Sequence, residues 1–189
     1  NGTTAQRVAE AEKAAAVLGA TIEFADLGGD AHFVPSLPNA LKLAAIIRRI
    51  RPALVLAPTL IENQHPDHST LGKLVRNAAR LARYGGVKEL LDTPAHAIGA
   101  LFFYAITPEA EPRNHATIFV NVSDGVAAWT TAMKAHASQA ATRDYVELQL
   151  TRAHLHGLSA GVAHAIPLWP ADPLVVDSLA PMVRTARRF

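Results

Sequence analysis

Two histidines and an aspartate stand close together in the segment His65-Pro66-Asp67-His68. Neutral imidazole is the commonest metal-binding side chain in proteins, and it also transfers protons near neutral pH. A carboxylate beside an imidazole can hold one tautomer of the ring and raise its basicity. The segment therefore predicts a site at which imidazole binds a metal ion or transfers a proton.

A helix-capping turn is the competing interpretation of the same four residues. Pro66 restricts the backbone of His65 to an extended conformation, and Asp67 and Ser69 are residue types that commonly cap helices. In such a turn Asp67 caps the next helix and both histidines are solvated. One catalytic zinc ion needs about three protein ligands, so the tetrapeptide alone leaves both interpretations open.

The tetrapeptide stands between a predicted strand and a predicted helix. Residues 53–57 form a continuously apolar run that a proline ends, which is typical of a buried strand. A helix is predicted from Asp67 or Ser69 to about Arg83, where two glycines follow. Open α/β sheets bind their ligands at the carboxyl ends of their strands. The sequence therefore predicts that the histidines line a ligand-binding crevice.

Helices and strands alternate along most of the chain. Such alternation, with continuously apolar strands, indicates a mostly parallel sheet that helices cover on both faces. We therefore expect an α/β fold, a three-layer, doubly wound, Rossmann-like sheet, in a single domain over residues 1–189. Because the chain opens on a helix, we also expect the first strand of this sheet to be absent. The other predicted helices are 4–18, 39–50, 124–139, 143–158 and 173–187, and the other predicted strands are 21–25, 98–106 and 117–122.

Composition excludes several classes of protein. Half of the 189 residues are hydrophobic and 18% are charged, which is enough apolar material for a packed core. The chain has no cysteine, so disulfides and thiolate zinc sites are excluded. No apolar run approaches the ~20 residues of a membrane span. The net charge is only +2, without interleaved basic and aromatic residues, so no nucleic-acid partner is expected. We expect a cytoplasmic protein.

Several separated segments resemble the PIG-L/LmbE-like zinc-dependent N-deacetylases. Within that family the similarity is greatest to the bacterial enzymes that deacetylate the GlcNAc-malate precursor of bacillithiol. The resemblance covers nearly the whole chain. The matching segments are Asn1-Gly2-Thr3 with Arg7, residues 51–58 leading to the tetrapeptide, Phe119 to Ser123 with Lys134 to Gln139, and Tyr145 to Val162.

The resemblance implies a role for each candidate residue. His68 matches the zinc-ligating histidine. His65 matches an active-site histidine that stabilises the tetrahedral oxyanion or protonates the leaving amine, and Asp67 matches its carboxylate partner. Arg7 matches an arginine that binds substrate. His136 stands where relatives carry a tyrosine or histidine that helps to hold the oxyanion.

The chain departs from the family in one motif. The family's Ala-His-Pro-Asp-Asp motif supplies two zinc ligands and the general base, and this sequence does not contain it. The resemblance places those ligands upstream of Asn1. We therefore expect a metal-dependent N-deacetylase of small N-acetyl amino sugar conjugates that forms a homotrimer or homohexamer. We expect its 189 residues alone to be inactive and to bind zinc weakly or not at all.

Two other hypotheses remain open. In the first, the chain is a catalytically dead α/β module for binding or assembly. In the second, it is a different metal hydrolase that takes all its ligands from this sequence. That hydrolase requires His32, His96 or His115 to approach His68.

Overall fold

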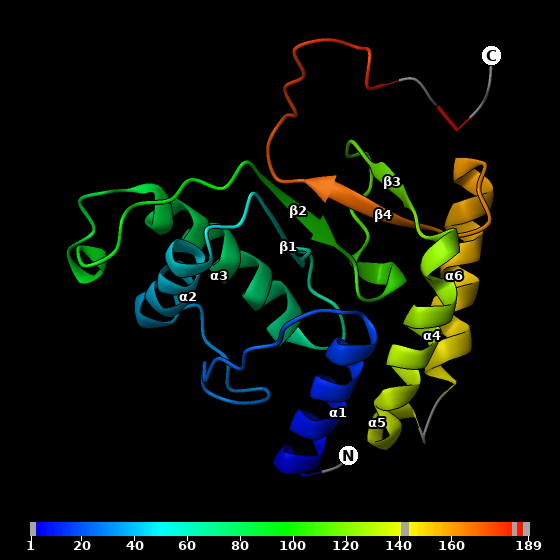
Figure 1. Ribbon diagram of the computed structural model, residues 1–189, viewed down its shortest axis with the longest axis horizontal. Helices are drawn as coiled ribbons and strands as arrows, with labels where there is room; N and C mark the ends of the chain where they lie inside the picture. Colours follow the sequence, from blue (N-terminus) through cyan, green and yellow to red (C-terminus); the bar gives the residue numbers. More distant parts are fainter. Residues whose placement is uncertain (1–2, 141–143, 183–184, 187–189) are drawn as a thin grey trace. The chain divides into compact units, whose positions relative to one another are not determined.

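A computed structural model of the chain describes residues 3–140, 144–182 and 185–186 (Figure 1). Its α-helices are α1 (Thr4–Val17), α2 (Leu37–Ile50), α3 (Pro66–Arg83), α4 (Val126–Ala135), α5 (Ala137–Ala140) and α6 (Tyr145–Ala160). The strands are β1 (Leu54–Pro58), β2 (Ala100–Tyr104), β3 (Ile118–Asn121) and β4 (Ala165–Pro170), in the sheet order β1-β2-β4-β3. The short 3₁₀ helices in the described part of the chain are η1 (Lys88–Leu90), η2 (Pro108–Ala110) and η3 (Ser123–Gly125).

The chain divides into two compact units. The first unit comprises residues 1–24, 119–166 and 178–189, and the second comprises residues 25–118 and 167–177. Each unit is therefore built from segments that are far apart in the sequence. The expectation of one domain over residues 1–189 stays a prediction.

A parallel pair of strands forms the framework of the second unit. β1 and β2 pair in register from Leu54 opposite Ala100 to Pro58 opposite Tyr104. The end of β4 runs antiparallel to β2, with Trp169 opposite Phe103. Since parallel strands end at the same edge of a sheet, the segments that follow β1 and β2 meet there.

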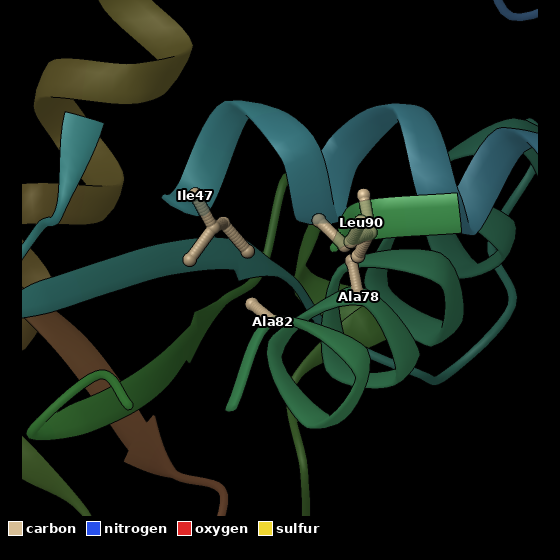
Figure 2. Close-up of a cluster of buried hydrophobic side chains, with 5 residues drawn as sticks. Ile47, Ala78, Ala82 and Leu90 are labelled. Carbon is tan, nitrogen blue, oxygen red and sulfur yellow. The ribbon is translucent and has the colours of Figure 1, made fainter. Parts of the chain in front are cut away.

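Helix α3 packs closely on β1 and α2. A Cβ atom at Gly72 would collide with the carbonyl oxygen of Pro58, so only glycine permits this approach of α3 to the end of β1. Small side chains likewise allow α2 and α3 to pack closely against each other. Figure 2 shows Ala78 and Ala82 of α3 beside Ile47 of α2 and Leu90, in a cluster of buried apolar residues.

The first unit is mainly helical. Thr3 caps α1 by accepting a hydrogen bond from the backbone N–H of Gln6, and Asp144 caps α6 in the same way. Gly161 ends α6 in the left-handed conformation that glycine adopts without strain. Among the described residues, no helix is both long enough and apolar enough to cross a membrane.

The predicted α/β class is confirmed, with a four-stranded sheet flanked by helices. Three element predictions are wrong. Residues 21–25 form no strand, and the helix predicted over 124–139 is interrupted at His136. The described residues of the predicted helix 173–187 are not helical, and residues 183, 184 and 187 lie outside the described part. Strand β4 was not predicted.

Candidate active site

The candidate site lies where the chain leaves β1 in the second unit. Thr59 extends the pairing by donating its backbone N–H to Tyr104 at 3.0 Å. Its hydroxyl donates to the carbonyl oxygen of Ala110 at 2.8 Å, and the residue is only 3% exposed. The segment between β1 and α3 is thus anchored to the segment that follows β2. This places His65 at the carboxyl edge of two parallel strands.

His65 stands immediately before α3 with both ring nitrogens close to carboxylates. Its backbone is extended, with φ −121° and ψ 106°, as the following proline requires. Nε2 lies 3.1 Å from Oδ1 of Asp30, and Nδ1 lies 3.8 Å from Oδ2 of Asp67. Nδ1 is buried and makes no hydrogen bond to the described part of the chain, although the side chain is 39% exposed. The ring therefore has carboxylates at two sides.

Asp67 does not cap helix α3. His65 is the N-cap, and no side chain in the described part of the chain hydrogen-bonds to the first turn as a cap. Oδ2 of Asp67 instead accepts the backbone N–H of Ala31 at 2.8 Å. The carboxylate thus joins the loop around Ala31 to the tetrapeptide, which contradicts the capping-turn interpretation of Asp67.

His68 lies on the first turn of α3, half-buried beside His65. The two ring centroids are 5.3 Å apart, and Nδ1 of His68 lies 3.3 Å from Oδ1 of Asn63. Burial lowers the pKa of His68, and the charge of the neighbouring His65 lowers it further to a smaller extent. The carboxylates of Asp67 and Asp30 act in the opposite direction. A lowered pKa favours the neutral imidazole, which is the form that binds a metal ion.

Arg7 and His136 lie in the first unit. Arg7 is exposed on α1; with the amide of Gln139 turned so that its oxygen faces Arg7, that oxygen accepts Nη2–H at 2.6 Å and Nε–H at 2.9 Å. His136 is half-buried and ends α4. Two residues later, Ser138 donates its backbone N–H and its hydroxyl to the carboxylate of Glu10. Residues of α1 thus hold the segment that follows His136.

Glu10 is a buried carboxylate that the sequence did not single out. The hydrogen bond from the Ser138 hydroxyl, and then that from its backbone N–H, lower the pKa of Glu10 below the ordinary value of 4.5. The nearby charge of His136 acts in the same direction. A glutamate on a predicted helix carries no pattern in the sequence that would indicate a distant partner. The contact of Glu10 with Ser138 of α5 was therefore not predicted.

One group of side chains in the described part of the chain brings three potential metal-ligating atoms within 4.8 Å of one another: Asp30, His65 and Asp67. That group contains none of His32, His96 and His115, which the hypothesis of a self-contained metal hydrolase required. The imidazole of His96 instead contacts the carbonyl oxygen of Pro52 at 2.8 Å. The imidazole of His68, whose ring lies beside that of His65, is a further potential metal ligand near this group.

The structure thus brings three of the five predicted site residues together in the second unit: His65, Asp67 and His68. The other two, Arg7 and His136, belong to the first unit. Sequence reasoning missed Asp30 and Asn63. Asp30 follows two glycines in a loop and carries no recognisable pattern, whereas Asn63 lies two residues before the predicted motif, in the segment that leads to it.

Residues 1–79 match the PIG-L family. Its model is described as GlcNAc-PI de-N-acetylase. The matched part includes Arg7, His65, Asp67 and His68, and His136 lies beyond it. The match supports a relationship to the PIG-L/LmbE superfamily over these residues.

Solved structures share the fold over most of the chain. A conserved protein from Thermus thermophilus aligns with a TM-score of 0.78 and 28% identity, over 97% of this chain and 80% of its own. GalB, the 4-carboxy-2-hydroxymuconate hydratase of Pseudomonas putida, aligns with a TM-score of 0.77 and 24% identity, over 93% of this chain and 75% of its own. The N,N'-diacetylchitobiose deacetylase of Pyrococcus horikoshii aligns with a TM-score of 0.73 and 22% identity, over 88% of this chain and 63% of its own.

Proposed function

We propose that the protein containing this chain is a metal-dependent N-deacetylase. It hydrolyses the acetamide of an N-acetylglucosaminide and releases acetate, and GlcNAc-malate is the proposed substrate. The grouping of His65, Asp67 and His68 at the carboxyl edge of β1 carries this proposal, because these residues lie within the segment that matches the PIG-L family. The deacetylase among the structural neighbours adds support.

Zinc is the proposed metal, and His68 is its proposed ligand from this chain. The imidazole fits that role because its Nδ1 faces Asn63, so the other ring nitrogen can be offered to a metal. Bound zinc lowers the pKa of a water molecule toward ~7 and polarises the acetyl carbonyl. A catalytic zinc needs about three protein ligands, so we propose that the others lie upstream of Asn1.

One side of β1 has no neighbour among the described strands, which supports such an upstream segment. β1 stands at the end of the sheet order, and Leu54 and Leu56 are about half exposed, at 50% and 51%. A continuously apolar strand is normally buried within a parallel sheet. A parallel strand beside β1 would end at the same edge as His65, and the helix that connects it to the rest of the sheet could cover the face on which both leucines lie.

The side chains of this chain supply binding and proton transfer in this proposal. His65 donates a hydrogen bond to the developing oxyanion and then a proton to the leaving amine. When its ring is protonated, Asp67 and Asp30 balance the charge. Arg7 binds an anionic part of the substrate, such as a malate carboxylate, and His136 assists in holding the oxyanion.

Acetate release by the natural protein, purified with zinc, tests the proposal. GlcNAc-malate, free GlcNAc and N,N'-diacetylchitobiose are compared as substrates, and we expect the first to give the highest kcat/KM. The 189-residue chain alone is expected to release no acetate and to bind zinc weakly. Hydration of 4-carboxy-2-hydroxymuconate belongs in the same panel because a fold hosts more than one reaction.

The competing hypothesis is a catalytically dead module for binding or assembly. It predicts no acetate release from any of these compounds, even by the natural protein with zinc. We further propose that the natural protein is cytoplasmic and forms a homotrimer or homohexamer. Light scattering on the natural protein measures its oligomeric state directly.

A further inference from the structure

Asn63 connects three parts of the candidate site. Its Oδ1 accepts the backbone N–H of His65 at 3.1 Å and lies 3.3 Å from Nδ1 of His68. Its Nδ2 donates to the hydroxyl of Thr107 at 3.2 Å. The amide therefore spans from the segment after β1 to the segment after β2 and contacts the imidazole of His68.

The orientation of this amide is set by the backbone of His65. A backbone N–H only donates, so the atom of Asn63 that faces it must be the oxygen. The same oxygen faces Nδ1 of His68, and an amide oxygen only accepts. Nδ1 of a neutral His68 must therefore carry the proton, which leaves the lone pair on Nε2.

We infer that Asn63 is a positioning residue that fixes the tautomer and the ring orientation of His68 so that Nε2 is the metal-binding atom. The assignment of the tautomer stands on the hydrogen bonds alone, whereas its use for metal binding rests on the proposed function. Mutation of a residue that hydrogen-bonds to a metal-ligating histidine commonly lowers metal affinity about 10- to 100-fold.

Thr107 gives the amide a fixed support. It lies beyond β2 and immediately before η2, and its hydroxyl accepts from Asn63. The same segment is held to the end of β1, since Thr59 donates to Ala110. A side chain held at both ends of its amide restricts the ring of His68 more than a single contact would.

The first test uses the metal-free natural protein labelled with ¹⁵N. Long-range ¹H–¹⁵N correlation spectra distinguish the two neutral tautomers of His68. We expect Nδ1–H in the wild type and a shift toward Nε2–H in Asn63→Ala. Asn63→Asp keeps an oxygen at the same place and should keep Nδ1–H, and Gln64→Ala is the matched control on an exposed neighbour. An Nε2–H tautomer in the wild type would overturn the inference.

The second test measures zinc affinity of the same proteins by competition with a chelator. We expect Asn63→Ala to weaken zinc binding about 10- to 100-fold and Asn63→Asp to stay within a few-fold of the wild type. Thr107→Val, which removes the support without touching the histidines, should fall between them. Equal zinc affinities of Asn63→Ala and Gln64→Ala would contradict the positioning role. If the natural protein binds no zinc, the proposed function fails while the tautomer measurement still decides the role of Asn63.

Discussion

Glu10 on α1 and Ser138 on α5 are joined by two hydrogen bonds, although 128 residues separate them in the sequence. Oε1 of Glu10 accepts the backbone N–H of Ser138 at 2.9 Å, and Oε2 accepts its hydroxyl at 2.7 Å. The carboxylate is buried. These bonds fix the segment that directly follows His136.

The ionised form of Glu10 is expected to stabilise the first unit. Its folded-state pKa lies below the ordinary 4.5, so this stabilisation is present above that pH and is lost as pH falls through the folded value. We predict that Glu10→Gln is less stable than the wild type near neutral pH and that the difference disappears on acidification. Urea unfolding at a series of pH values measures it. Glu12→Gln, on the same helix and exposed, is the control, and a pH-independent difference would contradict the assignment.

Arg48 is predicted to contribute strongly to the stability of the second unit. The residue is only 3% exposed, and its guanidinium donates to backbone carbonyls at the end of α3 and beyond. These carbonyls belong to Leu81, Ala82, Tyr84, Leu90 and Thr93. Arg48→Met leaves them without this donor, and we expect a loss of about 3 kcal/mol or more in the free energy of unfolding. Arg76→Met, on the exposed face of α3, should change it little, and equal effects would disprove the prediction.

The contact between Gly72 and β1 should be intolerant of a methyl group. Gly72→Ala must push α3 away from Pro58, because the added Cβ meets the carbonyl oxygen of that residue. We expect a destabilisation of about 1–3 kcal/mol and a displaced tetrapeptide. Gly85→Ala, where a Cβ meets no atom within 4 Å, is the matched control. Thermal unfolding of both variants measures the effect. If Gly72→Ala is as stable as the wild type, α3 does not pack against the end of β1 as closely as described above.

Two variants, His65→Ala and Asp30→Asn, separate two possible roles of His65: proton transfer and metal binding. If His65 transfers a proton, His65→Ala lowers kcat about 10²- to 10⁴-fold and leaves bound zinc unchanged. If the group of Asp30, His65 and Asp67 holds the metal instead, both His65→Ala and Asp30→Asn lose it. Elemental analysis of the natural protein and its variants, beside kcat, distinguishes these outcomes.

The sequence was most informative where local chemistry determines structure. Proline after His65 and the apolar run before it predict the strand, the extended residue and the helix, and all three occur. β4 was missed because Pro167 and Pro170 lower the strand signal, although both lie within the strand. Residues 21–25 carry strand-like residue types, but the described chain forms no strand there.

Long-range contacts were the part that no sequence pattern predicts. Asp30 reaches His65 from a loop, and Asp67 accepts from Ala31 rather than capping its own helix. Each contact depends on how distant segments pack, and a single sequence does not record that packing. The family resemblance supplied roles for His65 and His68, whereas the structure supplied their neighbours.

We propose that His68 belongs to the catalytic centre of an N-deacetylase. The most direct test is the rate of acetate release from GlcNAc-malate by the zinc-loaded natural protein, compared with His68→Ala and with His115→Ala, an exposed histidine of the same unit. We predict that His68→Ala loses at least about 100-fold in rate together with its zinc, while His115→Ala keeps both. Full activity of His68→Ala would rule out this role of the residue.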